Sequence, residues 1–589
     1  MSALEPRTPP VFLDMNEKHI FIEAERFLLE MLRGSVNIRM DRARSGRASC
    51  WRSPHNLMRI RRIFPQSKYR PGCSPILERM RREYGEFARL AGAGRRALNG
   101  ELPVDHEWKV KPFLHQEMLL SYAVTMGHAA IFADCGAGKT AVGVNLIEWF
   151  KREHGGVRAL VVCPLSIINK AWGDDIEKFS GLAWTSLWFP SKAPSAQQRR
   201  DGLTGKDVSL LRRVKALSDP SIDVWVANYE TIRRDDFVSH LKNREFDIVI
   251  ADEASRIKDK NTKSFKNLMR ISESAKHRLV LTGTPAPNGV LDLWSQFMFV
   301  DRGETLDPHY TDFRQDVASS YNIGPGRPPT WRAKPGAADR VAPMVAMRSV
   351  SIKLEDCVDL PPVTTVERPV LLPPESMRAY QQMKTQLFAE IENQTLSVKN
   401  QLSKLTKLRQ ITGGFVYDTA GGNVIPMKKN PKLDELALVL EEIGGRDVIV
   451  WAEYRSEIEA ILERFKHRNP VSLYGGTGGQ VRKDEAFDVF RDDPACTLCV
   501  AHPQSASVGL TMTWAQYSIS YSISYRYDDD YQKNRRIYRP GQEKPVVFMY
   551  LVCPGTIDAT MMSCIRRKES LSDRLTPGSF DESVFRQGG

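Results

Sequence analysis

The chain has 589 residues, of which 42% are hydrophobic and 26% charged, and this balance is ordinary for a globular protein of about three or four domains. No run of about 18 apolar residues occurs, which excludes a membrane-spanning helix. The first residues lack the charged start and apolar stretch of a secretion signal, so we expect a cytoplasmic protein without membrane contact.

The positive charge is concentrated near the amino terminus. The formal net charge is +13, and residues 33–100 alone contain 17 Lys and Arg against 4 Asp and Glu. Residues 10–25 have the pattern of a hairpin and residues 74–90 that of a helix, so residues 1–100 are predicted to form a small basic α+β accessory domain. Such a basic patch indicates an anionic polymer or surface as partner.

Residues 101–304 alternate short apolar runs with helical patterns. The runs "RALVVCP", "FDIVIADEA" and "HRLVLTGTP" read as buried strands with polar residues at their carboxyl ends. This alternation is typical of a parallel α/β sheet, which binds ligands beyond the carboxyl ends of its strands.

A second α/β series is predicted over residues 429–589. Its strand candidates are "DVIVWAEY", "PVSLYGG", "CTLCVAHP", "QYSISYSI" and "VVFMYLVC". Residues 305–428 lie between the two series and contain two long helical patterns, so we predict a helical protrusion or linker region there.

The segment "IFADCGAGKT" ends in the tail of a phosphate-binding loop, although Ala133 replaces the usual leading glycine. The backbone N–H groups of residues 136–140 are expected to surround phosphate oxygens at the start of a helix. Lys139 would reach the β- and γ-phosphates, and Thr140 would bind magnesium.

An acidic pair, Asp252 and Glu253, closes the strand "FDIVI". Asp252 is predicted to hold magnesium and Glu253 to polarise the attacking water. The alternative role is that of a helix start, which Asp and Glu favour.

Arg536 and Arg539 stand three residues apart in "QKNRRIYRPGQ" of the second series. On a helix that spacing would place both on one face, from which they would neutralise the γ-phosphate of a nucleotide bound to the first series. A nucleotide site divided between two domains would close when ATP binds and relax after hydrolysis, which is typical of a motor protein. Considered without the other motifs, the pair is more typical of an exposed basic face.

These segments occur in an order that resembles one family, the superfamily-two helicases of the Swi/Snf DNA-translocase type, in their short phage and bacterial versions. The resemblance covers residues 113–568 and rests on "LHQ", "ADCGAGKT", "VVCPLSIINKAW", "VANYET", "ADEAS", "LTGTPAPN", "SASVGLTMTWA" and "QKNRRIYRPGQ". It implies an α/β fold of two RecA-like lobes, with ATP in the cleft and duplex DNA across both lobes. It also implies a bacterial cell or a phage-infected host.

The resemblance completes the predicted nucleotide site. With magnesium on Thr140 and Asp252, the ATP contacts are Gln116, Asp134, Cys135, Gly136, Ala137, Gly138, Lys139, Thr140, Gly509 and Gln532. The chain also departs from the family pattern beyond Ala133: Ser255 replaces a usual histidine, Arg535 stands where Asp is common, and "YSISYRYDDDYQ" lacks the Trp-Asn-Pro often found there.

Contacts with the nucleic-acid backbone are predicted for Ser166, Thr231 and Thr511, whose small hydroxyls suit phosphate oxygens. Each is also a residue type found at turns and helix starts. The basic amino-terminal stretch, with Trp51, Phe64 and Tyr69, would add a sequence-neutral grip, unless its aromatic residues form a core.

The sequence thus predicts a nucleic-acid-stimulated ATPase that moves on duplex or branched DNA. Two alternatives stay open: an ATP-gated DNA clamp without processive movement, and an RNA helicase. A small-molecule kinase would leave the second lobe and its arginines unexplained. We expect a monomer whose further partners are replication, repair or recombination proteins.

Overall fold

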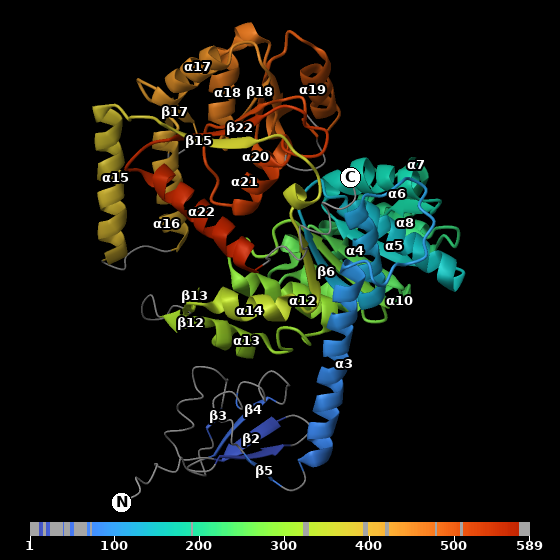
Figure 1. Cartoon of the computed structure of the whole chain (residues 1–589). Helices are drawn as coiled ribbons and strands as arrows, with labels where there is room; N and C mark the ends of the chain where they lie inside the picture. The colour runs from blue at the N-terminus through green and yellow to red at the C-terminus, as the bar shows by residue number, and fades with distance from the viewer. Residues whose placement is uncertain are drawn as a thin grey trace, which may run out of the picture.

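The structure is a computed structural model, and it describes residues 11–15, 19–23, 39–40, 47–51, 60, 68–70, 73–189, 193–321, 329–392, 398–418, 423–477, 480–506 and 511–575. Three regions are visible in Figure 1: an amino-terminal sheet joined to a long helix, a first α/β lobe, and a second α/β lobe at the opposite end of the molecule. The two predicted RecA-like lobes are confirmed.

The first lobe is built on a parallel sheet of seven strands in the order β14-β6-β11-β10-β7-β9-β8. The strands span Ser349–Ile352, His128–Ala133, His277–Thr282, Ile248–Asp252, Ala159–Cys163, Val224–Asn228 and Trp184–Ser186. All six strand pairings are parallel, so the carboxyl ends of the strands meet at one edge.

Strand residues of this sheet alternate between two hydrophobic cores. In β6, Ile131 packs into one core and Phe132 into the other, and in β10 the same holds for Ile250 and Ala251. The core containing Ile131 is covered by α4 (Leu114–Met126), α5 (Lys139–His154) and α6 (Asp174–Phe179). Burial on both sides explains why these strands are apolar without interruption.

The second lobe has a parallel sheet of six strands in the order β15-β22-β21-β18-β20-β19. These strands span Val363–Pro369, Val546–Val552, Tyr517–Ser520, Val448–Trp451, Leu498–Ala501 and Val471–Leu473. Its helices include α17 (Pro431–Ile443), α18 (Arg455–Arg464), α19 (Gln480–Asp492), α21 (Tyr527–Asn534) and α22 (Ile557–Leu575).

Strand pairing corrects the predicted boundaries at residues 304 and 428. β14 pairs with β6 in the first sheet, and β15 pairs with β22 in the second. α13 (Tyr310–Val317) and α14 (Ala337–Val345) also contribute side chains to the first lobe's core. β15 escaped prediction because it is an edge strand with mostly exposed, polar residues, which lack the apolar run of a central strand.

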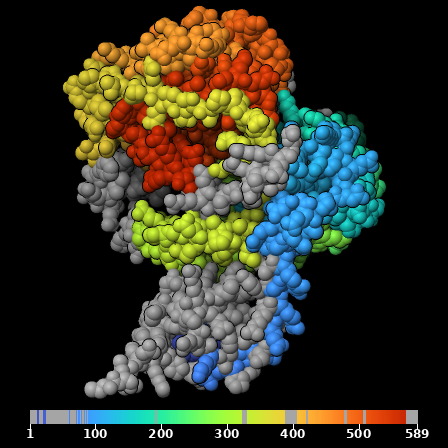
Figure 2. All heavy atoms as spheres, viewed as in Figure 1, coloured from blue at the N-terminus to red at the C-terminus, as the bar shows by residue number. Residues whose placement is uncertain are grey.

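The protrusion therefore reduces to α15 (Pro374–Glu392) and α16 (Val398–Thr412), which pack against each other beside the second lobe (Figure 1). In the space-filling view of Figure 2, the orange and red second lobe lies above the yellow-green band that contains α14. α14 contacts α22, so the lobes also touch away from the predicted nucleotide site.

The amino-terminal region contains the predicted hairpin and helix. β1 (Phe12–Met15) and β2 (His19–Glu23) pair antiparallel within a sheet of five strands. α3 (Ser74–Leu98) runs from this sheet to the first lobe and packs on α4 (Figure 1). Gly94 permits that approach, since a Cβ there would lie 2.5 Å from Met126 Sδ. None of the helices in the described ranges combines the length and hydropathy needed to cross a bilayer.

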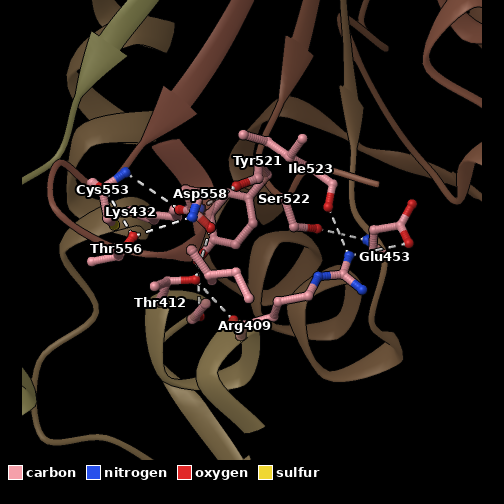
Figure 3. Close-up of polar contacts among 12 residues, drawn as sticks. Arg409, Thr412, Lys432, Glu453, Tyr521, Ser522, Ile523, Cys553, Thr556 and Asp558 are labelled. Carbon is pink, nitrogen blue, oxygen red and sulfur yellow. Dashed lines mark hydrogen bonds and ion pairs between the residues drawn. The ribbon is translucent and has the colours of Figure 1, made fainter. Parts of the chain in front are cut away.

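A buried ion pair joins α17 to α22 in the second lobe (Figure 3). Lys432, 1% exposed, places its Nζ 2.7 Å from Asp558 Oδ2 and donates to the carbonyl oxygen of Tyr521 at 3.0 Å. Burial by itself would lower the pKa of Lys432, but the Asp558 carboxylate raises it, so the lysine stays charged.

The base of α16 is fastened to the same network. Thr412 donates its hydroxyl to Asp558 Oδ1 at 3.1 Å, and Arg409 donates to the carbonyl oxygen of Ile523 at 2.7 Å (Figure 3). These contacts tie the protrusion to the second lobe, and we expect the two to move together.

We predict that Lys432→Met destabilises the second lobe by about 3–5 kcal/mol, because it leaves Asp558 buried without its cation. Urea unfolding of the full chain measures the change. Lys466→Met is the matched control, because Lys466 pairs with Glu463 at the surface, where both side chains are mostly exposed. Equal effects of the two substitutions would contradict the prediction.

Candidate active site

The phosphate-binding loop follows β6 and leads into α5. Gly136 and Gly138 have φ angles of 97° and 76°, in the left-handed region that favours glycine. The amides of the first turn of α5 have no carbonyl partner within the helix and carry its positive dipole end. Lys139 opens the helix, and its Nζ donates to the carbonyl oxygens of Ala133 (2.6 Å) and Asp134 (3.0 Å), which keeps the ammonium at the loop.

The start of α4 packs directly on this loop. A Cβ on Gly138 would lie 1.9 Å from Gln116 Nε2, so the predicted adenine-binding Gln116 touches the loop at the position where only glycine fits. Nε2 of the neighbouring His115 lies 3.0 Å from the carbonyl oxygen of Ala137. Phe113, 56% exposed, stacks on His115 at the surface.

Asp252 lies at the carboxyl end of β10, buried at 5% exposure. Its Oδ2 accepts a hydrogen bond from Trp172 Nε1 at 2.9 Å, and its Oδ1 accepts from the N–H of Glu253 at 2.9 Å. Burial raises the pKa of Asp252, and the positive charge of Lys139 partly offsets that rise. The acidic strand end and the loop lysine therefore face the same space.

Glu253 adopts a left-handed backbone conformation with φ 51° and ψ 53°. Such strain in a residue other than glycine clusters at functional sites. Burial, and then the charge of Asp252, raise the pKa of Glu253 to about 7. Gln532 Nε2 of the second lobe lies 3.4 Å from Glu253 Oε2, and both side chains line a pocket that Ser255 also borders.

Arg536 and Arg539 come from the second lobe and reach the loop of the first. A Cβ on Gly136 would lie 3.7 Å from Arg539 Nε, and Arg536 is 7% exposed. Burial lowers the pKa of Arg536 to about 10 and lowers the pKa of Arg539. The structure corrects one expectation: α21 ends at Asn534, so the arginines lie in the turns after the helix, ahead of Pro540.

A cross-lobe contact lies beside this pair. Arg535 Nη2 lies 2.8 Å from Asp134 Oδ2 in the phosphate-binding loop, and the Tyr531 hydroxyl donates to Asp134 Oδ1. Glu355, after β14, lies 3.5 Å from the same guanidinium. Burial would lower the pKa of Arg535, but Tyr531 and Asp134 raise it. The arginine that departs from the family pattern thus has a specific acidic partner.

The predicted nucleic-acid residues lie in three different environments. Ser166 is exposed in the turn Leu165–Ile167 after β7, and Thr511 is exposed with its Oγ1 2.8 Å from Arg539 Nη1. Thr231 is 3% exposed, and its hydroxyl donates to Asn228, so a phosphate contact would require that pair to open. Gly509 lies outside the described residues. Cys135 is part of the loop and is partly exposed.

The structure adds residues that the motif analysis did not assign. They are His115 on the loop, Trp172 and Tyr229 on Asp252, and Tyr531 and Arg535 on Asp134. Tyr531 and Arg535 stand four residues apart, a spacing that places two helical side chains near each other. This spacing was the feature of the sequence that could have indicated a shared partner.

Two RecA-like sheets, a phosphate-binding loop in one and arginines from the other define a two-lobed nucleotide hydrolase of the P-loop class. A family model for the SNF2-related domain matches residues 77–413, more than half of the chain. The chain therefore belongs to the family of SNF2-related proteins, and it is an ATP-hydrolysing enzyme of that family.

Among curated proteins, protein p41 of Acyrthosiphon pisum secondary endosymbiont phage 1 is 26% identical, over 79% of this chain and 97% of that protein. Human ZRANB3, described as a DNA annealing helicase and endonuclease, is 22% identical over 78% of this chain. An ATP-dependent helicase of Mycoplasma pneumoniae is 22% identical over 75% of it. The chain spans only 40% of ZRANB3 and 39% of the Mycoplasma protein.

Among solved structures, the Sulfolobus solfataricus SWI2/SNF2 ATPase core in complex with dsDNA is 23% identical, with a TM-score of 0.36. The match covers 82% of this chain and 98% of that one.

We predict that Arg535→Met and Asp134→Asn each shift the nucleotide-free chain toward an open arrangement of the lobes, and that the double variant shifts it by less than the sum of the two. All three variants break the Arg535–Asp134 ion pair, so the double-mutant cycle should give a coupling of about 0.5–3 kcal/mol. Spin labels on α8 (Gly205–Ser218) and α18, attached through unnatural amino acids, report the lobe-to-lobe distances.

Arg526→Met is the control for this cycle, because Arg526 pairs at 3.6 Å with Asp529 of its own lobe. Lobe-to-lobe distances that respond equally to the control and to Arg535→Met would refute a specific role for the Asp134 contact.

Proposed function

We propose that the chain is an ATP-driven translocase on duplex or branched DNA. The observation that carries this proposal is that Gln532 and Arg539 of the second lobe contact Glu253 and the loop glycine Gly136 of the first. A nucleotide bound there would touch both lobes, so its hydrolysis would change the force between them. The name of ZRANB3, a DNA annealing helicase and endonuclease, supports DNA as the track.

The residues fit ATP and magnesium. The loop that Gly136 and Gly138 open would take the phosphates, with Lys139 beside the β- and γ-phosphates and Gln116 beside the adenine. Thr140 and Asp252 offer the oxygen ligands that magnesium prefers. Magnesium, when bound, supplies positive charge against the phosphate oxygens.

Hydrolysis would use the remaining charged groups. Glu253, as a carboxylate, would orient and polarise the attacking water. Arg536 and Arg539 would neutralise charge that develops on the γ-phosphate, a contribution worth about 10³–10⁵ in rate in enzymes with such arginines. Because Arg539 also contacts Thr511, one of the predicted nucleic-acid residues, the same guanidinium would link the state of the nucleotide to the DNA-facing edge.

Glu253→Gln is predicted to lower ATP turnover by about 10²–10⁴-fold, because the amide cannot accept a proton from the attacking water. Wild-type turnover should rise strongly with at least one form of DNA, and the variant should lose that stimulation. Turnover is measured with duplex, forked and single-stranded DNA and with RNA. Stimulation by RNA alone would favour the RNA helicase, and no stimulation by any polynucleotide would refute the proposal.

Movement is tested separately. A translocase should displace a third strand from a triplex at a rate that follows ATP turnover. A clamp that only closes and opens would hydrolyse ATP on the same DNA without displacing the strand. Monomeric state and association with replication, repair or recombination proteins remain parts of the proposal, and sedimentation on DNA tests the first of them.

A further inference from the structure

Trp172 is a fully buried residue with a polar contact inside the candidate active site. Its exposed fraction is 0%, and its indole N–H donates to Asp252 Oδ2 at 2.9 Å. A buried tryptophan needs an acceptor for this N–H, and a backbone carbonyl would serve. Here the acceptor is the carboxylate at the end of β10, which is the predicted magnesium ligand.

The local backbone fixes the position of Trp172. β7 ends at Cys163, a tight turn follows over Leu165–Ile167, and residues Ile168–Gly173 form a π-helix. Short π-helical segments are rare and occur often at functional sites. Lys170 in the same segment lies 2.6 Å from Asp484 of the second lobe, so this segment also touches the other lobe.

The indole ring is held between α5 and β10. A Cβ on Gly143 of α5 would lie 2.9 Å from Trp172 Cη2 and 3.3 Å from Ile250 Cδ1, so the helix approaches the ring as closely as a glycine allows. Gly143 lies three positions after Thr140 in α5, and Ile250 lies two positions before Asp252 in β10. The ring therefore touches both elements that carry the predicted magnesium ligands.

Asp252 receives three hydrogen bonds from its own lobe. Trp172 binds Oδ2, the Glu253 N–H binds Oδ1, and the Tyr229 hydroxyl binds the backbone carbonyl oxygen at 2.7 Å. Each carboxylate oxygen has a second lone pair, so these hydrogen bonds fix the rotation of the carboxylate and leave a lone pair on each oxygen for a metal ion or water. Partners that orient a metal ligand in this way typically contribute 10–100-fold to metal affinity or activity.

We propose that Trp172 is a positioning residue whose indole N–H holds Asp252 in the orientation that binds magnesium with the nucleotide. This inference rests on the proposed function, since it assumes that Asp252 binds magnesium at a nucleotide site. It assigns to the π-helix Ile168–Gly173 a part in metal binding, while Ser166, a predicted nucleic-acid contact, lies in the turn before it.

The test is a magnesium titration of ADP binding, followed with a fluorescent ADP analogue and without DNA. Trp172→Phe keeps an aromatic ring and removes the donor. We expect it to weaken the apparent affinity for magnesium by about 10–100-fold, while ADP binding in chelator stays within about twofold of the wild type. ATP turnover should recover at high magnesium concentration, because the defect lies in holding the ion.

Trp225→Phe is the matched control. Trp225 is also 0% exposed in the first lobe, and its indole N–H donates to the carbonyl oxygen of Ala216 at 2.9 Å, away from the loop and Asp252. It should leave the magnesium titration unchanged. If Trp172→Phe proves unstable, 3-benzothienylalanine at position 172 replaces the N–H by sulfur within the same bicyclic shape and is expected to give the same shift.

The inference is overturned if either replacement of Trp172 titrates with magnesium like the wild type, or if Trp225→Phe shifts the titration equally. Failure of the proposed function gives a different result. A wild-type chain that binds nucleotide and magnesium but shows no DNA-stimulated hydrolysis would refute the translocase. In that chain a weakened magnesium titration of Trp172→Phe would still support the role of Trp172, and an unchanged titration would overturn it.

Discussion

The parallel register of three neighbouring strands is the constraint on which the site depends. Asp252 of β10 stands opposite Leu281 of β11, and Leu281 stands opposite Ile131 of β6. Because adjacent strands lie about 4.8 Å apart, this register brings the acidic strand end and the start of the phosphate-binding loop within about 10 Å, at one level of the sheet. A slip of one residue would turn Asp252 toward the opposite face. The two hydrophobic cores, which take alternate strand residues, forbid that slip.

A short segment of the second lobe contacts both the phosphate-binding loop and Glu253. Tyr531, Gln532, Arg535 and Arg539 lie within nine residues, and they contact Asp134, Glu253 and the surroundings of Gly136. A change of the nucleotide would therefore first alter the contacts at the end of α21, which belongs to the second lobe. Elsewhere in that lobe, the Lys432 network joins α16, α17 and α22 to one another.

Local patterns in the sequence were sufficient for much of this arrangement. The loop and Asp252 were predictable because a glycine-rich turn and an acidic strand end are formed by neighbours in the chain, and the apolar runs predicted both sheets. The partner of Arg535 was not predictable, because Asp134 is 401 residues away and the sequence alone does not show which acidic residue pairs with a given arginine. The phosphate contact of Thr231 stays a prediction, because in the structure its hydroxyl donates to Asn228, three residues earlier in the chain. β15 was hidden because an exposed edge strand lacks apolar alternation.

Burial acts on the two sides of the site in opposite directions. It raises the pKa of Asp252 and Glu253 and lowers the pKa of Arg536 and Arg539, so it opposes the charged form of every one of these groups. Charges taken out of water are costly unless they find close partners, and the acids and the arginines come from different lobes. A polyphosphate with a divalent ion carries both signs of charge and matches both sides at once. Its binding would offset the desolvation cost of these charged groups and draw the lobes together. Its hydrolysis would restore that cost. The free energy for movement would come from ATP hydrolysis, and the desolvation of these charged groups would couple it to the separation of the lobes.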